Sequence, residues 1–170
     1  MEYSISPDGE RFPLPSEADY ASEFERLQTV VAEKRQQGLE IVVVVGVGFV
    51  GAVMAAVVAD TVDKATGKPS KFVIGMQRPS PRSYWKIAYL NRGVPPVKAE
   101  DPEVDEIIPR CVKDKGTLIA TYTNEVLKLA DVVVVDVQCD YLKKDLGNLV
   151  TGHADMAALE KSFEVIGQLI

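Results

Sequence analysis

The sequence predicts an α/β fold with a doubly wound, mostly parallel sheet and an added N-terminal helix. Apolar runs of strand length alternate with segments of helical periodicity, which is the order that builds a parallel sheet covered by helices. Two runs, residues 41–45 (IVVVV) and 131–137 (DVVVVDV), are too apolar for half-exposed strands, so we expect both to be buried. A glycine-rich segment, GVGFVG at residues 46–51, joins the first run to an apolar helix.

The first 40 residues predict an arm followed by one amphipathic helix. Three prolines and a glycine in residues 1–15 indicate an irregular arm. Ser16 is a suitable N-cap and Gly38 a suitable stop for a helix with apolar residues at helical spacing. These apolar residues are Tyr20, Phe24, Leu27 and Val31. We expect this helix to pack onto the domain or onto a partner subunit, which leaves a homo-oligomer open.

Residues 41–170 predict strands and helices in alternation. Strands are expected at residues 41–45, 72–76, 117–121 and 131–137. Helices are expected at residues 49–62, 84–91, 104–112 and 125–130, with a last helix capped by Asp155. We therefore divide the chain into residues 1–40, the arm and first helix, and residues 41–170, one sheet domain.

Composition and charge disfavour several classes of function. The chain has 170 residues, of which 46% are hydrophobic and 26% charged, as in a globular domain. A net charge of −6 argues against nucleic acid and membrane surfaces, because both attract Lys and Arg. Two cysteines and one histidine predict no disulfide framework and no metal site. The polar N-terminus does not resemble a secretory signal, and a cytoplasmic location is the simplest inference.

Residues 41–60 raise the alternative of a membrane span, because they are uncharged before Asp60 and a span takes roughly 20 apolar residues. Five consecutive β-branched residues favour a strand instead. Gly46, Gly48 and Gly51 then interrupt the run where a strand-to-helix turn belongs. We therefore favour a soluble core over a membrane anchor.

The spacing of these glycines is that of a dinucleotide-binding turn of the Rossmann type. Gly46 permits the tight turn, Gly48 lets a pyrophosphate approach the backbone, and Gly51 lets the helix pack closely on the strand. The helix N-terminus adds free N–H donors and the positive end of a dipole. The motif alone is a weak signal, but its place between a buried strand and an apolar helix favours a cofactor site.

The acidic residue that normally ends the second strand of such a site is missing. The strand FVIGM runs into Gln77 and Arg78 instead. The Gln77 side chain is able to hydrogen-bond a ribose 2′-hydroxyl. Arg78 and Arg82 are able to contact a phosphate, including the 2′-phosphate of NADP, or are simply solvated loop charges. The sequence leaves NAD and NADP both open.

Five segments in order resemble the N-terminal domain of the UDP-glucose/GDP-mannose dehydrogenase family, the nucleotide-sugar 6-dehydrogenases. They are GVGFVG (46–51), KIAYLNRGVPP (86–96), AEDPEVDEII (99–108), GTLIATYTNEVLKLADVVVVDV (116–137) and HADMAALEKSFEVIG (153–167). The resemblance covers about residues 40–170. It implies that residues 41–170 form an NAD-binding domain of an enzyme that oxidises the C6 alcohol of a UDP- or GDP-sugar to a uronate.

The resemblance, together with the glycine spacing and the charges after the second strand, gives a set of cofactor-binding residues. The turn contributes Gly46, Val47, Gly48, Phe49, Val50 and Gly51; the later loops contribute Gln77, Arg78, Lys86, Thr121, Val137, Gln138 and Cys139. Gln77 stands at the ribose position, Lys86 near the adenosine end, and Val137 to Cys139 beside the nicotinamide. The family's catalytic residues and its sugar-nucleotide domain lie beyond Ile170, so we expect no catalytic residue here and no turnover by this chain alone.

Two residues and two alternative functions remain to be considered. Cys139 is favoured as a packed or half-buried thiol over a nucleophile, and Cys111 as a core residue. Asp136, an acid within an apolar strand, needs a partner, either a backbone N–H or the cofactor. The missing acid at Gln77 also permits a non-catalytic nucleotide-binding or assembly module, and another NAD(P)-dependent dehydrogenase is a further alternative.

Overall fold

The computed structural model describes residues 2–141 and 153–170. It divides the chain into two compact units, Met1–Asp136 and Val137–Ile170, and each is described by itself below. The first unit contains the sheet and the glycine turn.

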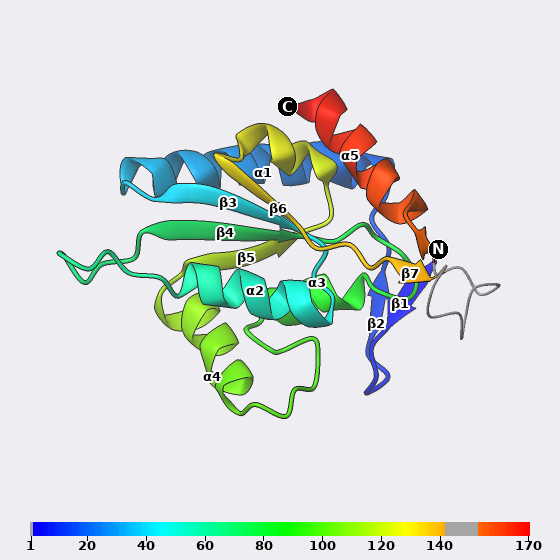
Figure 1. Cartoon of the computed structure of the whole chain (residues 1–170), viewed down its shortest axis with the longest axis horizontal. Coiled ribbons are helices and arrows are strands. Elements are labelled where there is room, and N and C mark those ends of the chain that lie inside the picture. The colour runs from blue at the N-terminus through cyan, green and yellow to red at the C-terminus, as the bar shows by residue number, and fades with distance from the viewer. Residues whose placement is uncertain (1, 142–152) are drawn as a thin grey trace. The chain divides into compact units, whose positions relative to one another are not determined.

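The first unit is built on a four-stranded parallel sheet (Figure 1). Its strands, in spatial order, are β5 (Leu118–Thr121), β4 (Lys71–Met76), β3 (Glu40–Val45) and β6 (Val132–Val135). Each neighbouring pair is parallel. The prediction of a doubly wound, mostly parallel sheet is therefore confirmed, and all four predicted strands are present.

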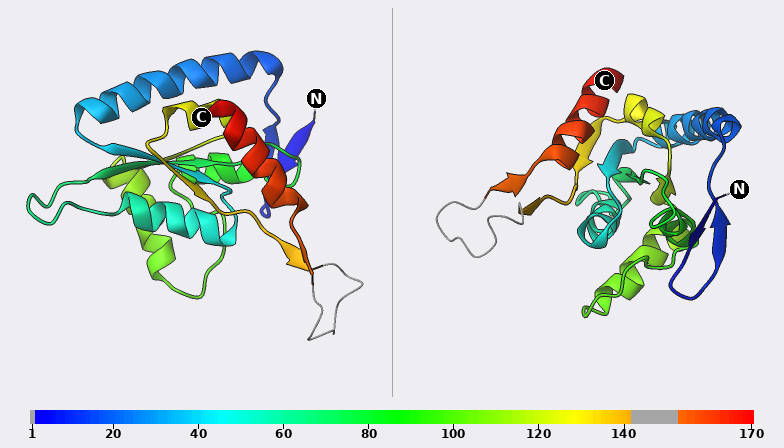
Figure 2. Two further views of the ribbon diagram at one scale, coloured as in Figure 1. Left: turned by 45° about the horizontal axis from the view of Figure 1, so that its top comes forward. Right: turned by 90° about the vertical axis from the view of Figure 1, so that its right-hand side faces the viewer.

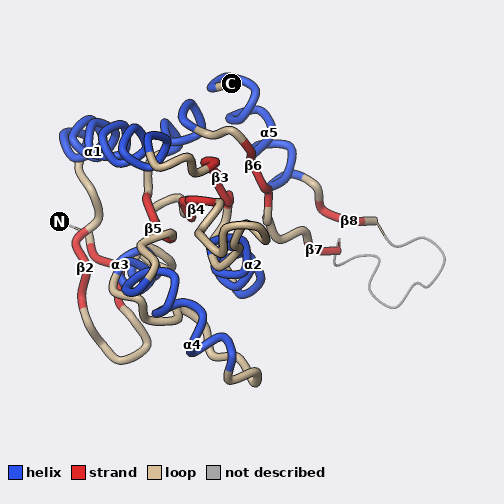
Figure 3. Tube along the Cα trace, turned by 90° about the vertical axis from the view of Figure 1, so that its left-hand side faces the viewer, coloured by secondary structure: helices blue, strands red, loops and turns tan. Residues whose placement is uncertain are grey.

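Helices cover both faces of the sheet (Figure 3). One face carries α1 (Glu17–Gln36), which contacts the 3₁₀ helix η2 (Asn124–Leu129). The opposite face carries α2 (Phe49–Ala59), α3 (Trp85–Asn91) and α4 (Glu103–Pro109), the last continued by the π-helical segment η1 (Arg110–Asp114). The added N-terminal helix is thus present, and Leu27 and Val31 of its predicted apolar stripe are buried.

The apolar run at residues 41–60 is divided between β3 and α2. Its strand half is buried because β3 lies between β4 and β6 with helices on both sides. Across the described part of the chain, no helix combines the length and apolar character that crossing a membrane requires.

The register of the sheet brings four strand ends to one edge. Val45 of β3 pairs with Met76 of β4 and Val135 of β6, and Met76 pairs with Thr121 of β5. The residues that follow these strand ends therefore lie along the carboxyl edge of the sheet, where open α/β sheets bind ligands.

Two sequence-based expectations in this unit are wrong. β6 is not fully buried: Val132 is 41% exposed, because β6 has a strand partner only on its β3 side within the described residues. The N-terminal arm is not irregular either, since β1 (Tyr3–Ile5) and β2 (Arg11–Pro13) form an antiparallel hairpin. Gly9, with φ of 89°, allows the chain to reverse between them.

The hairpin lies beside α3 (Figure 2). Ser4 accepts a hydrogen bond from the N–H of Trp85 at 3.1 Å, and Arg92 forms an ion pair with Glu10. Phe12 stacks edge-on against Tyr89 at 6.0 Å. These contacts hold the N-terminal segment against the helix that follows the loop after β4.

The second unit contains a two-stranded antiparallel pair, β7 (Asp140–Tyr141) with β8 (Ala154–Asp155), and the helix α5 (Ala157–Leu169). The carboxylate of Asp155 accepts a hydrogen bond from the N–H of Ala157 at 3.1 Å. The predicted last helix is confirmed, but its N-cap is Met156 and not Asp155, which lies one residue earlier and bonds the first N–H of the helix.

Candidate functional site: the glycine turn

The three glycines of the turn between β3 and α2 differ in their surroundings. Gly46 has φ of 97°, and its N–H donates to the carbonyl of Met76 at 2.8 Å. A Cβ on Gly46 would lie 2.1 Å from the carbonyl oxygen of Asp136, and one on Gly51 only 1.9 Å from that of Gly46. A Cβ on Gly48 would meet nothing within 4 Å. Gly46 and Gly51 are therefore required by packing, whereas space is open beside Gly48.

The N-terminus of α2 is a potential anion site. Gly48 is its N-cap, no side chain caps it, and no acidic residue lies in its first turn. The N–H groups at the start of a helix have no intrahelical acceptor, and the helix dipole makes this end positive. Phe49 and Val50, which begin the helix, are 62% and 53% exposed. The residues that carry the first N–H groups of α2 are therefore exposed, as an anion site at this helix end requires.

The side chain of Val47 does not face this space. It is fully buried, and a Cβ on Gly75 of β4 would lie 2.6 Å from its Cγ1. Val47 therefore anchors the turn onto the sheet, and only its backbone belongs to the rim of the site.

Gln77, which follows β4, is bound to the turn itself. Its Oε1 accepts a hydrogen bond from the N–H of Val47 at 3.1 Å, while its backbone N–H donates to Thr121 at 3.0 Å. Its Nε2 lies 3.4 Å from the Oγ of Ser83. The oxygen of the Gln77 carboxamide thus holds the turn in place, while its Nε2 makes two long contacts, the one to Ser83 and another to the carbonyl of Arg78 at 3.5 Å.

The basic residues after β4 differ in their surroundings. Arg78 and Arg82 are exposed, and no ion pair involves either of them within the described residues. The Nζ of Lys86 lies 6.0 Å from the centre of the Trp85 ring. The loop thus offers two unpaired guanidinium groups, and Lys86 lies over an aromatic surface.

Thr121, at the end of β5, is buried, and its side chain contacts α1. Its hydroxyl donates to a carboxylate oxygen of Glu23 at 2.7 Å. The same hydroxyl lies 3.5 Å from the N–H of Thr123. Thr121 therefore shares the carboxyl edge with Gln77 and the turn, but its side chain serves the contact with α1.

The three predicted residues after β6 fall in the second unit, which begins at Val137. Gln138 donates to Asp140 at 3.3 Å, and the Sγ of Cys139 lies 3.7 Å from the carbonyl of Val137. The expectation of a packed or half-buried thiol at Cys139 is wrong, because the residue is exposed. Cys111, in contrast, is buried in the core as predicted.

Asp136 belongs to the turn, although the predicted set of cofactor residues omits it. Its N–H donates to the carbonyl of Val45 at 2.8 Å, which continues the β3–β6 ladder beyond the strand end. A Cβ on Gly51 would lie 2.6 Å from its Oδ2. The sequence showed Asp136 as an acid at the end of an apolar strand. The parallel register of β6 on β3 then places this acid beside the glycine turn.

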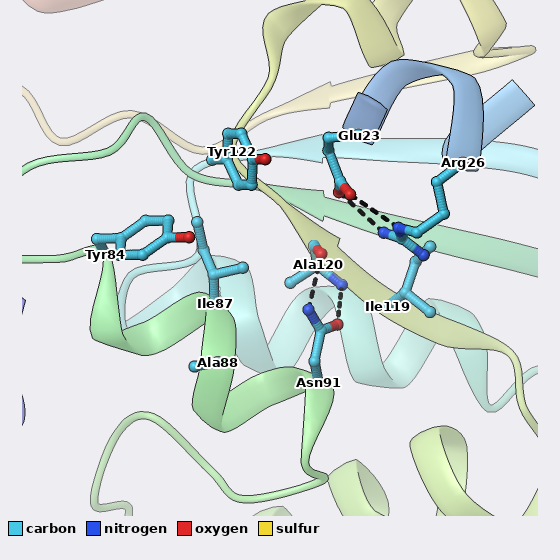
Figure 4. A pocket seen from close by; sticks show the side chains of 9 residues that line it. All are labelled: Glu23, Arg26, Tyr84, Ile87, Ala88, Asn91, Ile119, Ala120 and Tyr122. Atoms are coloured by element: carbon cyan, nitrogen blue, oxygen red, sulfur yellow. Dashed lines mark hydrogen bonds and ion pairs between the residues drawn. The ribbon is translucent and has the colours of Figure 1, made fainter. Parts of the chain in front are cut away.

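A second concavity lies at the outer edge of β5 and has a volume of about 500 Å³ (Figure 4). Glu23 and Arg26 of α1 form an ion pair at one side, and Tyr84 and Tyr122 stack edge-on with centroids 5.8 Å apart. Burial raises the pKa of Tyr122 to about 12, so its hydroxyl is neutral. This cavity has paired charges and aromatic walls, and it lacks the free N–H donors of the glycine turn.

Comparisons with known proteins found a similar solved structure. No protein-family model and no curated protein sequence matches the chain. Among solved structures, it is similar to the NDP-N-acetyl-D-galactosaminuronic acid dehydrogenase of Methanosarcina mazei Go1, with 29% identity and a TM-score of 0.64. The match covers 85% of this chain and 27% of that chain. The similarity agrees at a coarse level with the resemblance to nucleotide-sugar dehydrogenases, and this chain spans about a quarter of that protein's length.

Proposed function

We propose that this chain is the NAD-binding part of a nucleotide-sugar 6-dehydrogenase. The observation that carries the proposal is the glycine turn, with open space at Gly48 beside an uncapped helix N-terminus. A pyrophosphate needs free N–H donors and close access to the backbone, and this turn supplies both. The similarity to a nucleotide-sugar dehydrogenase supports the same conclusion.

The position of the turn in the sheet supports a dinucleotide as the ligand. From β3 the chain proceeds outward to β4 and β5, and then returns to β6 on the other side of β3. The strand order therefore reverses between β3 and β6. Dinucleotides bind across the crevice at this switch point of doubly wound sheets. The turn directly follows β3 and thus borders that crevice.

Each part of the turn has a role in this proposal. The N–H groups of Phe49 and Val50 bind the pyrophosphate, and the Nε2 of Gln77 donates to the adenosine ribose. The side chain of Gln77 is uncharged and suits a ribose that carries free hydroxyls. We therefore propose NAD as the cofactor. NADP remains the alternative, in which Arg78 and Arg82 bind the 2′-phosphate.

The bound NAD supplies a hydride acceptor for oxidation of an alcohol to a carboxylate. We propose that the sugar nucleotide, a UDP- or GDP-sugar, is bound outside residues 1–170. No residue of this chain is assigned a catalytic role. The chain alone is therefore expected to bind the cofactor without turning over the substrate.

Calorimetric titration with NAD, NADH, NADP and NADPH tests the proposal. Gly48→Val is the sharpest variant, because the Cβ of the new side chain enters open space, where it meets nothing within 4 Å. We expect the variant to fold and to lose dinucleotide binding. Gly167→Ala, at another glycine with open space, is the matched control and keeps binding unchanged. If Gly48→Val binds as tightly as the natural sequence, the pyrophosphate does not bind at this turn.

A second candidate function is a non-catalytic module that keeps the fold and binds no dinucleotide. The hydrogen bond from Val47 to Gln77 favours it, since the side chain at the ribose position already serves the turn. Absence of binding by all four dinucleotides would support this candidate. Preference for the phosphorylated forms would instead assign Arg78 and Arg82 to the 2′-phosphate.

A further inference from the structure

The carboxylate of Asp136 lies at the site proposed for the pyrophosphate. The parallel register aligns Val135 with Val45, so Asp136 lies beside Gly46. Its carbonyl approaches the α-carbon of Gly46, and its Oδ2 approaches that of Gly51, close enough to exclude a Cβ at either position. The acidic group is therefore fixed at the first turn of α2.

This carboxylate has no protein partner in the part of the chain that the structure describes. No hydrogen bond or ion pair to the Asp136 carboxylate is present among the described residues, although its side chain is half-buried. The first turn of α2 has no acid of its own, and Asp136 places a carboxylate oxygen against it, 2.6 Å from the position of a Cβ on Gly51. A carboxylate at this end of a helix is favoured by the dipole. It thus occupies an electrostatic position that an external anion would otherwise take.

The cations of the neighbouring loop do not neutralise it. Arg78 and Arg82 follow β4, on the side of β3 opposite to β6, and neither pairs with Asp136. A pyrophosphate that bound to the N–H groups of Phe49 and Val50 would therefore meet an uncompensated negative charge. Like charges a few ångströms apart near a protein surface repel strongly enough to change affinity by at least an order of magnitude.

We propose that Asp136 sets the affinity of the turn for dinucleotides by repelling the pyrophosphate, so that the natural chain binds them weakly. The inference rests on the proposed function, because it assumes that the pyrophosphate binds at the start of α2. The role of Asp136 differs from that of the glycines. The glycines provide space for the pyrophosphate, and the carboxylate weakens the binding of a negatively charged group in that space.

The test compares NADH binding by the natural sequence, Asp136→Asn and Asp114→Asn. Asparagine keeps the shape of the side chain and removes its charge. Asp114 is the matched control, because it is exposed and precedes β5, at the amino edge of the sheet. Titrations at low and at high salt separate charge repulsion from a change in shape, since salt screens only the former.

We expect Asp136→Asn to bind NADH about tenfold more tightly than the natural sequence at low salt. The difference should shrink at high salt, and Asp114→Asn should bind like the natural chain. Equal binding by Asp136→Asn and the natural chain overturns this inference alone. Weaker binding by Asp136→Asn also overturns it, because the carboxylate would then accept a hydrogen bond from the ligand. If neither chain binds, the proposed function fails together with the inference.

Discussion

The side-chain amide of Asn91 hydrogen-bonds both polar backbone groups of Ala120. Its Nδ2 donates to the carbonyl of Ala120 at 3.0 Å, and its Oδ1 accepts from the N–H at 2.7 Å. Ala120 lies on β5, the outermost strand of the described sheet on that side. Unpaired groups on such an edge invite pairing with another chain. Asn91 therefore takes the place of a neighbouring strand at this one residue.

Asn91→Ala is expected to lower the free energy of unfolding by about 1–3 kcal/mol, because two hydrogen bonds to a buried strand residue are lost. Urea denaturation followed by circular dichroism measures the change. Gln28→Ala removes an exposed amide from α1 and serves as the control, with an effect below about 0.5 kcal/mol. Equal effects of the two substitutions would mean that the Asn91 bonds contribute nothing to stability.

Alanine substitutions at Gly51 and Gly48 are expected to differ sharply. At Gly51 the new Cβ would lie 1.9 Å from a backbone oxygen, so we expect a loss of about 3 kcal/mol or more in unfolding free energy. At Gly48 the space is open, and we expect a change below about 1 kcal/mol. Thermal unfolding of both variants measures this difference. A tolerated Gly51→Ala would show that α2 is not packed as closely on β3 as described.

The strands and the glycine turn were predictable because their signals are local. Five β-branched residues in a row leave few alternatives to a buried strand, and three glycines mark the turn that follows. The N-terminal hairpin was missed because prolines are turn signals in the sequence, whereas its contacts lie with α3, some 80 residues later. Asp136 was visible as an anomaly, but its neighbours Gly46 and Gly51 follow only from the register of β6 on β3.

The predicted role of Thr121 illustrates the same limit. Its position at a strand end is readable from the sequence, and the structure puts it at the carboxyl edge. The use of its hydroxyl depends on Glu23, 98 residues away in α1. The exposure of β6 likewise depends on which strands surround it, and not on its own apolar composition.

Asp60 is expected to make the protein sensitive to acid. Hydrogen bonds from Arg110, and then from Lys115, lower the pKa of this carboxyl from 3.8 to about 2. A group whose pKa is lowered by folding stabilises the protein above its unfolded pKa and loses that contribution as the pH falls through the folded pKa. Asp60 therefore contributes stability above about pH 4 that disappears towards pH 2. Because its side chain is 25% exposed, we expect about 1–2 kcal/mol.

Asp60→Asn tests this contribution. The variant is expected to be less stable than the natural chain at pH 7 and to match it more closely near pH 2, when unfolding free energies are measured across that range. Asp114→Asn removes an exposed carboxylate with no ion pair in the described structure and should leave the pH dependence unchanged. A difference between Asp60→Asn and the natural chain that is constant from pH 7 to pH 2 would contradict the assignment.

Ser4→Ala is expected to loosen the loop that carries the proposed ribose contact. The buried hydroxyl of Ser4 donates to the carbonyl of Pro81 at 2.9 Å and accepts from the N–H of Trp85 at 3.1 Å. Its removal leaves a donor and an acceptor without their partner, at a cost of about 1–3 kcal/mol. Trp85 is the single tryptophan and is 8% exposed, so its fluorescence should shift to longer wavelength as water gains access. Hydrogen exchange at the Trp85 amide should also become faster. Ser22→Ala, on the exposed face of α1, is the control and should change neither the fluorescence nor the exchange. Unchanged exchange in Ser4→Ala would show that the loop is held without the hairpin.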